Sequence, residues 1–228
     1  MQVRVRHTPT YGVARLVLAP GEPVRVVPGA MLATSYGVAV EAPARGGFLG
    51  FLFARGVRGR AKLPPTTFTA SAEGGWVDVA APLPGDLHVL DLDGRTGWVV
   101  ARGRWLATAA TVAVQPRWAG SDHLAGAAGG FLVHVAGQGP VVLSCYGALD
   151  VIDLRLGELV TVDSGHVVAY ADTVQCRLRP IGTNGARSVR SGAGMVFDFA
   201  GPGQVLTQTR SPRELFTAVR SNRVGAHG

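Results

Sequence analysis

The chain repeats one order of short segments three times, and this internal repeat restricts the fold more than any other feature of the sequence. Each copy begins with an alternating apolar strand that ends at a glycine turn, at residues 16–22, 87–94 and 149–158. A second strand then runs to Gly29, Gly103 and Gly165. Repeats of this length predict small units that stack on one another and share a core.

Two further segments follow each of these glycines, and glycine pairs or triplets mark the end of each copy. Because glycine adopts positive φ without steric cost, each copy is predicted to close with a β-hairpin. The third segments are residues 30–34, 104–108 and 166–170, and the fourth are 38–41, 111–114 and 173–176. The predicted hairpins are 68–79, turning at Gly74-Gly75, 131–144, turning at Gly137 to Gly139, and 195–208, turning at Gly201-Pro202-Gly203.

The composition supports an all-β protein of three tandem modules. Of its 228 residues, 47% are hydrophobic and only 16% charged, with 32 glycines and 14 prolines, which suits short strands and tight turns. The predicted modules are residues 1–84 with an insertion at 45–62, 85–148 and 149–212, with a C-terminal helix and tail over 213–228. Modules this small are expected to pack into one rigid body.

The end of the third module carries a helix-start signal. Ser211 suits the N-cap, Pro212 the first helical position, and Glu214 can close a capping box. We therefore expect a short helix there.

The net charge of +7 would ordinarily suggest an anionic partner, but its distribution argues against nucleic acid. Only Lys62 among the 22 basic residues is a lysine, and the arginines are spread along the chain without a nucleic-acid-reading motif. Cys145 and Cys176 lie in apolar runs and are predicted to be buried, reduced thiols. The first residues lack the apolar core of a secretory signal, so we expect a cytoplasmic protein.

Residues 124–149 contain no charged side chain and are long enough to cross a bilayer. Several glycines and Pro140 would break a lipid-exposed helix. The stretch is therefore predicted to be a hairpin buried on both faces.

Several short motifs, taken in order, resemble the altered inheritance of mitochondria family, protein number twenty-four. They are Pro-Gly-Ala-Met at 28–31, Pro-Leu-Pro-Gly-Asp at 82–86, Leu-Ser-Cys-Tyr-Gly at 143–147, Asp-Ser-Gly-His-Val-Val-Ala at 163–169, and Gly-Pro-Gly at 201–203 with Gln-Thr-Arg-Ser at 208–211. The resemblance covers nearly the whole chain.

The resemblance implies a fold similar to the tryptophan RNA-binding attenuation protein, a shortened double-stranded β-helix that packs edge to edge into rings. It also implies that three modules per chain give a homotrimer with nine modules in the ring. Such a ring would cover edge strands. The RNA and tryptophan binding of that relative does not transfer, because a fold does not fix a function.

No pattern in the sequence indicates an enzyme, a metal or another cofactor. The six histidines are scattered, with no His-x-His pair, and there is neither a nucleophile elbow nor a phosphate-binding glycine loop. The run 163–166, Asp-Ser-Gly-His, contains residue types that occur in catalytic sites, but its place in the repeat favours a turn.

The insertion at 45–62 is the candidate interaction site. It combines bulky apolar side chains with a basic cluster, which would suit an anionic membrane surface or a protein partner. A contact between subunits, or packing over its own module, is the alternative. The candidate contact residues are Phe48, Phe51, Phe53, Arg55, Arg58, Arg60 and Lys62.

We therefore expect a non-enzymatic scaffold or adaptor protein that forms a trimeric ring. The alternative is a regulator that binds RNA or a small ligand between modules. RNA binding would weaken with rising salt, which distinguishes the two.

Overall fold

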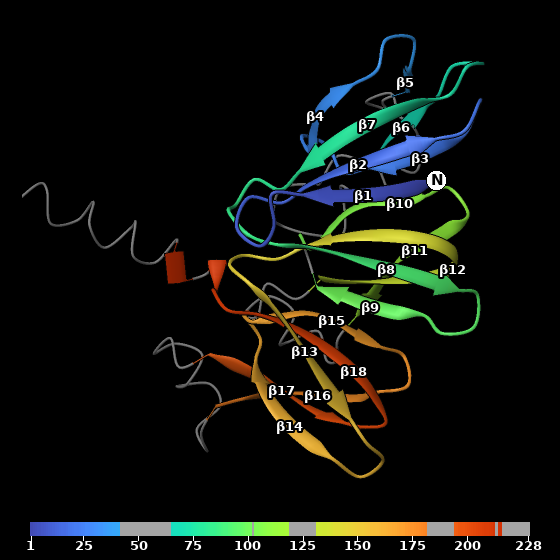
Figure 1. The fold of residues 1–228 in the computed structure, drawn as a ribbon. Coiled ribbons are helices and arrows are strands. Elements are labelled where there is room, and N and C mark those ends of the chain that lie inside the picture. The colour runs from blue at the N-terminus through green and yellow to red at the C-terminus, as the bar shows by residue number, and fades with distance from the viewer. Residues whose placement is uncertain (42–64, 102, 119–130, 182–193, 213, 216–228) are drawn as a thin grey trace, which may run out of the picture.

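The computed structural model describes residues 1–41, 65–101, 103–118, 131–181, 194–212 and 214–215. This part of the chain is all-β, as predicted. Its strands follow the sequence from one end of an elongated body to the other, with the N-terminal strands at the top of Figure 1 and the C-terminal strands at the bottom.

The strands fall into three consecutive groups. The first contains β1 (Gln2–Arg6), β2 (Val13–Leu18), β3 (Pro23–Val26), β4 (Met31–Thr34), β5 (Ala39–Glu41), β6 (Thr66–Thr69) and β7 (Gly75–Ala80). The second contains β8 (Leu87–Asp93), β9 (Trp98–Ala101), β10 (Trp105–Ala109), β11 (Val112–Trp118) and β12 (Phe131–Ser144). The third contains β13 (Leu149–Leu154), β14 (Leu159–Asp163), β15 (Val167–Ala171), β16 (Gln175–Pro180), β17 (Met195–Ala200) and β18 (Gly203–Gln208).

Each group has the same antiparallel pairings. In the first, β7 pairs with β2 and β4, and β6 pairs with β3 and β5. In the second, the end of β12 pairs with β8 and β10, and its beginning pairs with β9 and β11. In the third, β18 pairs with β13 and β15, and β17 pairs with β14 and β16.

A register shift recurs in β4, β10 and β15, and it fixes which residues correspond between groups. The shift directly precedes Ala33, Ala107 and Ala169. We call residues at the same position in this frame counterparts. Shifts of this kind increase local strand twist.

The three predicted hairpins are wrong, although the strands themselves are present. β12 runs unbroken through Gly137 and Gly139, and its two halves pair with different strands rather than with each other. Both glycines have positive φ, 126° and 122°, so the strand bends from one set of partners to another without reversing. In the other two groups, β6 and β7, and likewise β17 and β18, also lie in different ladders. The same pairings correct the prediction for residues 124–149, of which 119–130 lie outside the described part.

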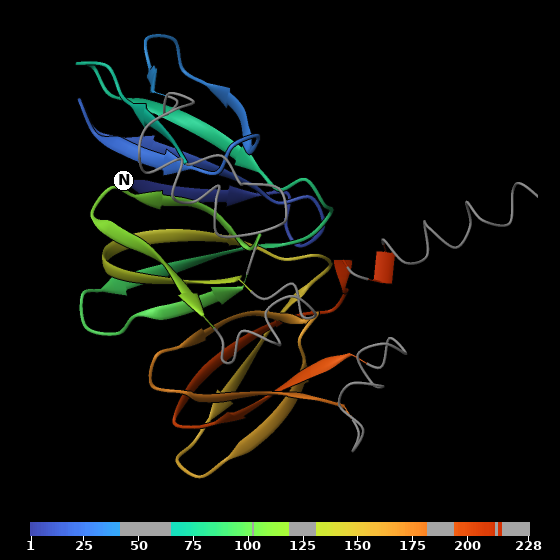
Figure 2. The same cartoon turned by 180° about the vertical axis from the view of Figure 1, so that it is seen from behind.

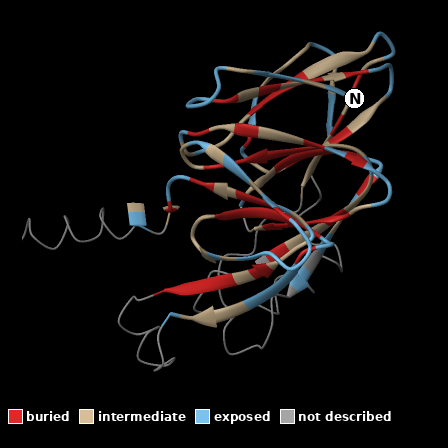
Figure 3. Ribbon diagram, turned by 60° about the horizontal axis from the view of Figure 1, so that its bottom comes forward, coloured by how far each residue is buried: buried red, intermediate tan, exposed pale blue. Residues whose placement is uncertain are grey.

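The hydrophobic core does not divide at the predicted module boundaries. One cluster combines the second and third groups, with Val99, Val135 and Phe199 fully buried. The other belongs to the first group but includes Leu106 and Val142 from the second. Figure 3 shows the buried residues along strands throughout the body. A fully buried Val, Leu or Phe contributes about 1.5–3 kcal/mol, so shared cores bind the groups together. The exact boundaries stay a prediction.

A helical turn follows the third group, where the sequence predicts it. Pro212, Glu214 and Leu215 are helical, and the Leu215 amide donates to the Ser211 carbonyl at 3.3 Å. The remaining residues of the predicted tail lie outside the described part.

Candidate functional site: two open sheet edges

The sequence predicts a contact loop at 45–62. Phe48, Phe51, Phe53, Arg55, Arg58, Arg60 and Lys62 all fall within residues 42–64, outside the described residues. Their role stays a prediction, and the site described below consists of other residues.

Two strand joints connect the three groups. β10 pairs with β3, through Ala107–Val26, Thr108–Arg25 and Ala109–Val24. β15 pairs with β9 in the corresponding register, through Ala169–Val100, Tyr170–Val99 and Ala171–Trp98. In each joint an outer strand of one group extends a sheet of the group before it. We call these the inner joints.

The strands of the second inner joint are buried on both faces. Val99 and Val100 on β9 have no exposed surface, and all five residues of β15 are buried. An ordinary strand alternates between core and solvent. Here each strand has its own core on one face and a neighbouring group on the other.

Ionic contacts lie at the end of this joint. Asp172 follows β15, and its carboxylate lies 2.6 Å from His134 Nε2 and accepts from an Arg117 guanidinium nitrogen at 3.0 Å. The Asp172 amide donates to the Gly97 carbonyl at 3.0 Å. A residue of the third group is thus held over the sheet of the second.

The first inner joint uses a different contact at the same place. The Arg25 guanidinium donates to the Ala110 carbonyl at 2.9 Å and to the Val112 carbonyl. Ala110 is the counterpart of Asp172. The geometry of the joint therefore recurs while its polar contacts change.

β4 and β14 have the edge positions of joint strands but no joint partner among the described residues. β4 ends the four-stranded sheet β1-β2-β7-β4, and β14 ends the three-stranded sheet β14-β17-β16. The two edges lie at opposite ends of the body, as Figures 1 and 2 show from opposite sides. Inside the chain, the corresponding edge strands are paired in the inner joints and connect the groups.

Large apolar side chains are exposed beside these two edges. Leu32 on β4 is 59% exposed, whereas its counterparts Leu106 and Val168 are 3% and 0% exposed. Tyr36 and Leu159 are 104% and 77% exposed. Single exposed apolar residues are normal on any surface, but the counterparts of Leu32 are buried at the inner joints, and so is Gly97, a counterpart of Leu159. Ala110 and Asp172, the counterparts of Tyr36, are exposed there.

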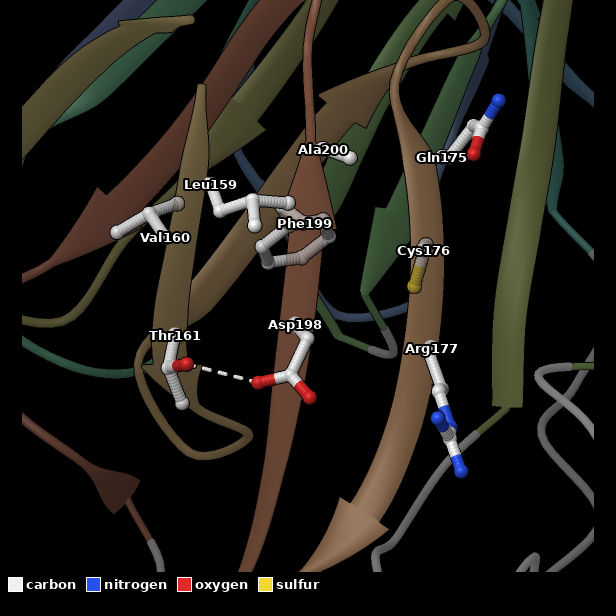
Figure 4. A pocket seen from close by; sticks show the side chains of 9 residues that line it. All are labelled: Leu159, Val160, Thr161, Gln175, Cys176, Arg177, Asp198, Phe199 and Ala200. Atoms are coloured by element: carbon white, nitrogen blue, oxygen red, sulfur yellow. Dashed lines mark hydrogen bonds between the residues drawn. The ribbon is translucent and has the colours of Figure 1, made fainter. Parts of the chain in front are cut away.

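A shallow hollow of about 480 Å³ lies on the sheet beside the β14 edge (Figure 4). Thr161, Asp198 and Arg177 lie in a row across its three strands. Asp198 accepts from Thr161 Oγ1 at 2.7 Å and from two Arg179 nitrogens at 2.6 and 3.0 Å. The hydrogen bonds from Arg179, and then from Thr161, hold the pKa of Asp198 below its usual value.

A second carboxylate cluster lies next to the β4 edge. Asp78 on β7 is 2% exposed and receives pairs of hydrogen bonds from Arg15 and Arg6. The bonds from Arg15, followed by those from Arg6, outweigh burial and lower the pKa of Asp78 to about 2. The Arg15 guanidinium also stacks over the Trp76 ring at 3.9 Å. The counterparts of Asp78 are Val142 and Leu206, so this position is charged only at the open end.

Two other sequence-based expectations have clear outcomes. The run 163–166 is a turn, in which Asp163 Oδ1 accepts from the Gly165 amide at 2.7 Å. The expectation of two buried thiols is half wrong: Cys145 is buried and Cys176 is exposed, because β16 lies on the uncovered sheet of the third group. Both cysteines are free.

Within the ranges that the structure describes, no cluster of three or more His, Cys, Asp or Glu side chains could hold a metal ion. In the same ranges, no helix is long and apolar enough to cross a membrane.

Sequence reasoning missed Leu32, Tyr36 and Leu159. A signal for Leu32 was present, because its strand position is apolar in all three copies, as Leu32, Leu106 and Val168. An apolar residue retained at an outer strand of every copy indicates that this strand is covered in every copy. The position of Tyr36 has no such signal, because it is not apolar in all three copies: its counterparts are Ala110 and Asp172.

The fold and its two open edges define an all-β protein with extended antiparallel sheets. At each end, one joint strand has no joint partner in the described part of the chain. The chain belongs to the AIM24 family, since the family model described as mitochondrial biogenesis AIM24 matches residues 3–210. The resemblance inferred from the motifs is thereby confirmed.

A solved structure shares this fold. The crystal structure of protein SPYM3_0169 from Streptococcus pyogenes superposes with a TM-score of 0.79 at 20% sequence identity, covering 97% of this chain and 99% of that chain. No curated protein matches the chain. At this identity the likeness concerns the fold and carries no activity.

Proposed function

We propose that this protein is a non-enzymatic scaffold or adaptor whose copies join head to tail into a closed ring of three. One observation carries the proposal. The two inner joints merge the other sheets of the three groups, and the β4 sheet and the β14 sheet are the two that remain unjoined. A β4–β14 joint between copies would complete a third extended sheet.

The exposed residues support this joint. In the inner joints, Leu106 and Val168 are buried against the preceding group, and Val26 and Val100 lie on the strand that receives them. At the open ends the counterparts are Leu32 and Val162, both accessible to solvent. Pairing the two edges would bury apolar surface that is costly to leave in water.

Closure into a ring is supported by the cost of open edges. Unpaired strands with exposed backbone groups template aggregation, and a closed ring leaves none of the joint edges free. A head-to-tail contact that does not close would instead grow into a filament. The number three rests on the resemblance described above, which implies nine modules in the ring.

Action through binding is supported by the roles of the acidic side chains beside the open edges and the second inner joint. Asp78, Asp172 and Asp198 all accept hydrogen bonds from basic side chains within the sheets. These contacts fix side chains in place, as an assembly surface requires. We also propose a reducing, cytoplasmic location, in keeping with the two free thiols.

Mass by light scattering tests the proposal. The protein should have about three times the chain mass of 23.7 kDa. Leu32→Glu should give the mass of one chain, because it places a charge in the joint. Leu156→Glu should keep the assembled mass, since Leu156 is 84% exposed on the β13–β14 turn and belongs to neither open strand. A single-chain mass for the unchanged protein, or an assembled Leu32→Glu variant, would overturn the proposal.

A further inference from the structure

Tyr36 is the most exposed large hydrophobic residue described in this chain, at 104%. It directly follows Ser35 after the open strand β4, where the chain turns toward β5. Rigid aromatic side chains are the commonest anchors of protein interfaces. Tyr36 thus lies where a partner of the β4 edge would begin.

The second inner joint shows what its counterpart does. Asp172 lies over the start of β9 and contacts His134 on β12 and Arg117 on β11. Its amide bonds the Gly97 carbonyl at 3.0 Å. The residue after an outer joint strand therefore crosses onto the sheet of the preceding group.

Two of the three matching positions on the uncovered sheet line the hollow of Figure 4, and the third, Arg179, holds Asp198 through its hydrogen bonds. Leu159 is the counterpart of Gly97, Asp198 of His134, and Arg179 of Arg117. The hollow, with Leu159 and Asp198 in its lining, is open to solvent. At the inner joint this position contains a short carboxylate, whereas at the open end the matching residue is a tyrosine.

We propose that Tyr36 of one copy occupies the hollow on β14, β17 and β16 of the next copy. This inference rests on the proposed ring and names the residue that anchors each contact between copies. The ring of Tyr36 packs against Leu159 and Ala200, and its hydroxyl donates to the Asp198 carboxylate. Asp198 has acceptor capacity for this bond, since a carboxylate can accept about four hydrogen bonds.

The inner joints also fix the strand register of this contact. Ala33 of one copy lies opposite Val162 of the next, Thr34 opposite Thr161, and Ser35 opposite Val160. The Tyr36 amide then donates to the Leu159 carbonyl, as the Asp172 amide donates to Gly97. The Thr34–Thr161 pair is a favourable cross-strand combination.

A two-chain design isolates one contact for measurement. A copy with Leu32→Glu has a blocked β4 edge and an intact hollow. A copy with Leu159→Glu has the reverse, because it adds a second carboxylate to the hollow beside Asp198. Mixed in equal amounts, they should form a dimer with a single joint, whose dissociation constant sedimentation or titration measures.

Tyr36→Ala in the Leu159→Glu copy should weaken this dimer about 30-fold, as an interface anchor does. Tyr36→Phe there should weaken it about 5-fold through the lost hydrogen bond. Tyr36→Ala in the Leu32→Glu copy is the matched control and should change nothing, because that Tyr36 faces solvent.

The outcomes separate the two proposals. Absence of any dimer, together with a single-chain mass for the unchanged protein, overturns the ring. A dimer that Tyr36→Ala in the Leu159→Glu copy leaves unchanged overturns the role of Tyr36 and leaves the ring standing. Equal weakening from either copy also overturns it, since only one Tyr36 lies in the joint.

Discussion

The open strand β4 has the same place in the repeat as β15, and the open strand β14 the same place as β9. β15 and β9 are paired in an inner joint, so the surroundings of the two pairs of strands differ. β15 is buried at every residue, whereas β4 is exposed or half-buried throughout. β9 is almost wholly buried, whereas β14 alternates between exposed and half-buried residues. The comparison shows that burial at these strands comes from the neighbouring group rather than from the local sequence.

The largest expected effect comes from placing the same charge at two counterpart positions. Val168→Glu should lower the free energy of unfolding by about 4 kcal/mol or more, because it buries an unpaired carboxylate. Leu32→Glu should change it by less than about 0.5 kcal/mol, because Leu32 is exposed in the single chain.

Urea unfolding measures both variants in a Leu159→Glu background, where assembly is blocked and only the single chain contributes. Equal losses at the two positions would show that Leu32 is part of the chain's own core. The contrast between inner and open strands would then fail.

The Asp78 cluster gives the next effect, because its counterparts Val142 and Leu206 cannot titrate. The pKa of Asp78 in the folded protein is about 2, below the ordinary value of 3.8. Its carboxylate therefore stabilises the fold above the ordinary pKa, and this contribution is lost as the pH falls from about 4 to 2. Asp78→Asn should lose about 2 kcal/mol at neutral pH and show a shallower decline in this window.

Acid titration of stability, followed by circular dichroism, measures the difference. Glu73→Gln is the control, since Glu73 is an exposed carboxyl of the same strand group. If Asp78→Asn declines with acid as steeply as the unchanged protein, the charge cluster does not stabilise the open end.

The sequence predicted the strands better than their pairing. Alternating apolar residues and glycines marked the strands and the family, because both signals are local. Glycines at 137 and 139 predicted a hairpin, yet β12 continues through them, since positive φ permits a bend as well as a reversal. Which strands pair across groups depends on contacts far apart in the chain, and no local pattern encodes them.

The candidate site was predictable only in part. The apolar counterparts of Leu32 could have indicated a covered strand. The exposure of Tyr36 and the hollow around Asp198 instead follow from the lack of a neighbouring group beside β4 and β14 among the described residues. The predicted loop at 45–62 was chosen for its composition, and it stays a prediction.

The smallest expected effect tests the contact that served as the template for Tyr36. A Cβ added at Gly97 would lie 2.6 Å from His134 Nε2 and closer still to Asp172 Oδ2. Gly97→Ala should cost about 1 kcal/mol, because both neighbours are ends of flexible side chains that can shift. Asp172→Ala in the same chain should recover part of that loss, which a double-mutant cycle of unfolding free energies measures.

The counterpart of Gly97 is Leu159, whose side chain is 77% exposed. Leu159→Ala should therefore leave the unfolding free energy of the single chain within about 0.5 kcal/mol. If Gly97→Ala costs the same with and without Asp172, the two residues are not coupled across the inner joint. The proposed contact of Tyr36 with Leu159 is based on the contact of Asp172 with Gly97. That proposal would then lose its structural basis.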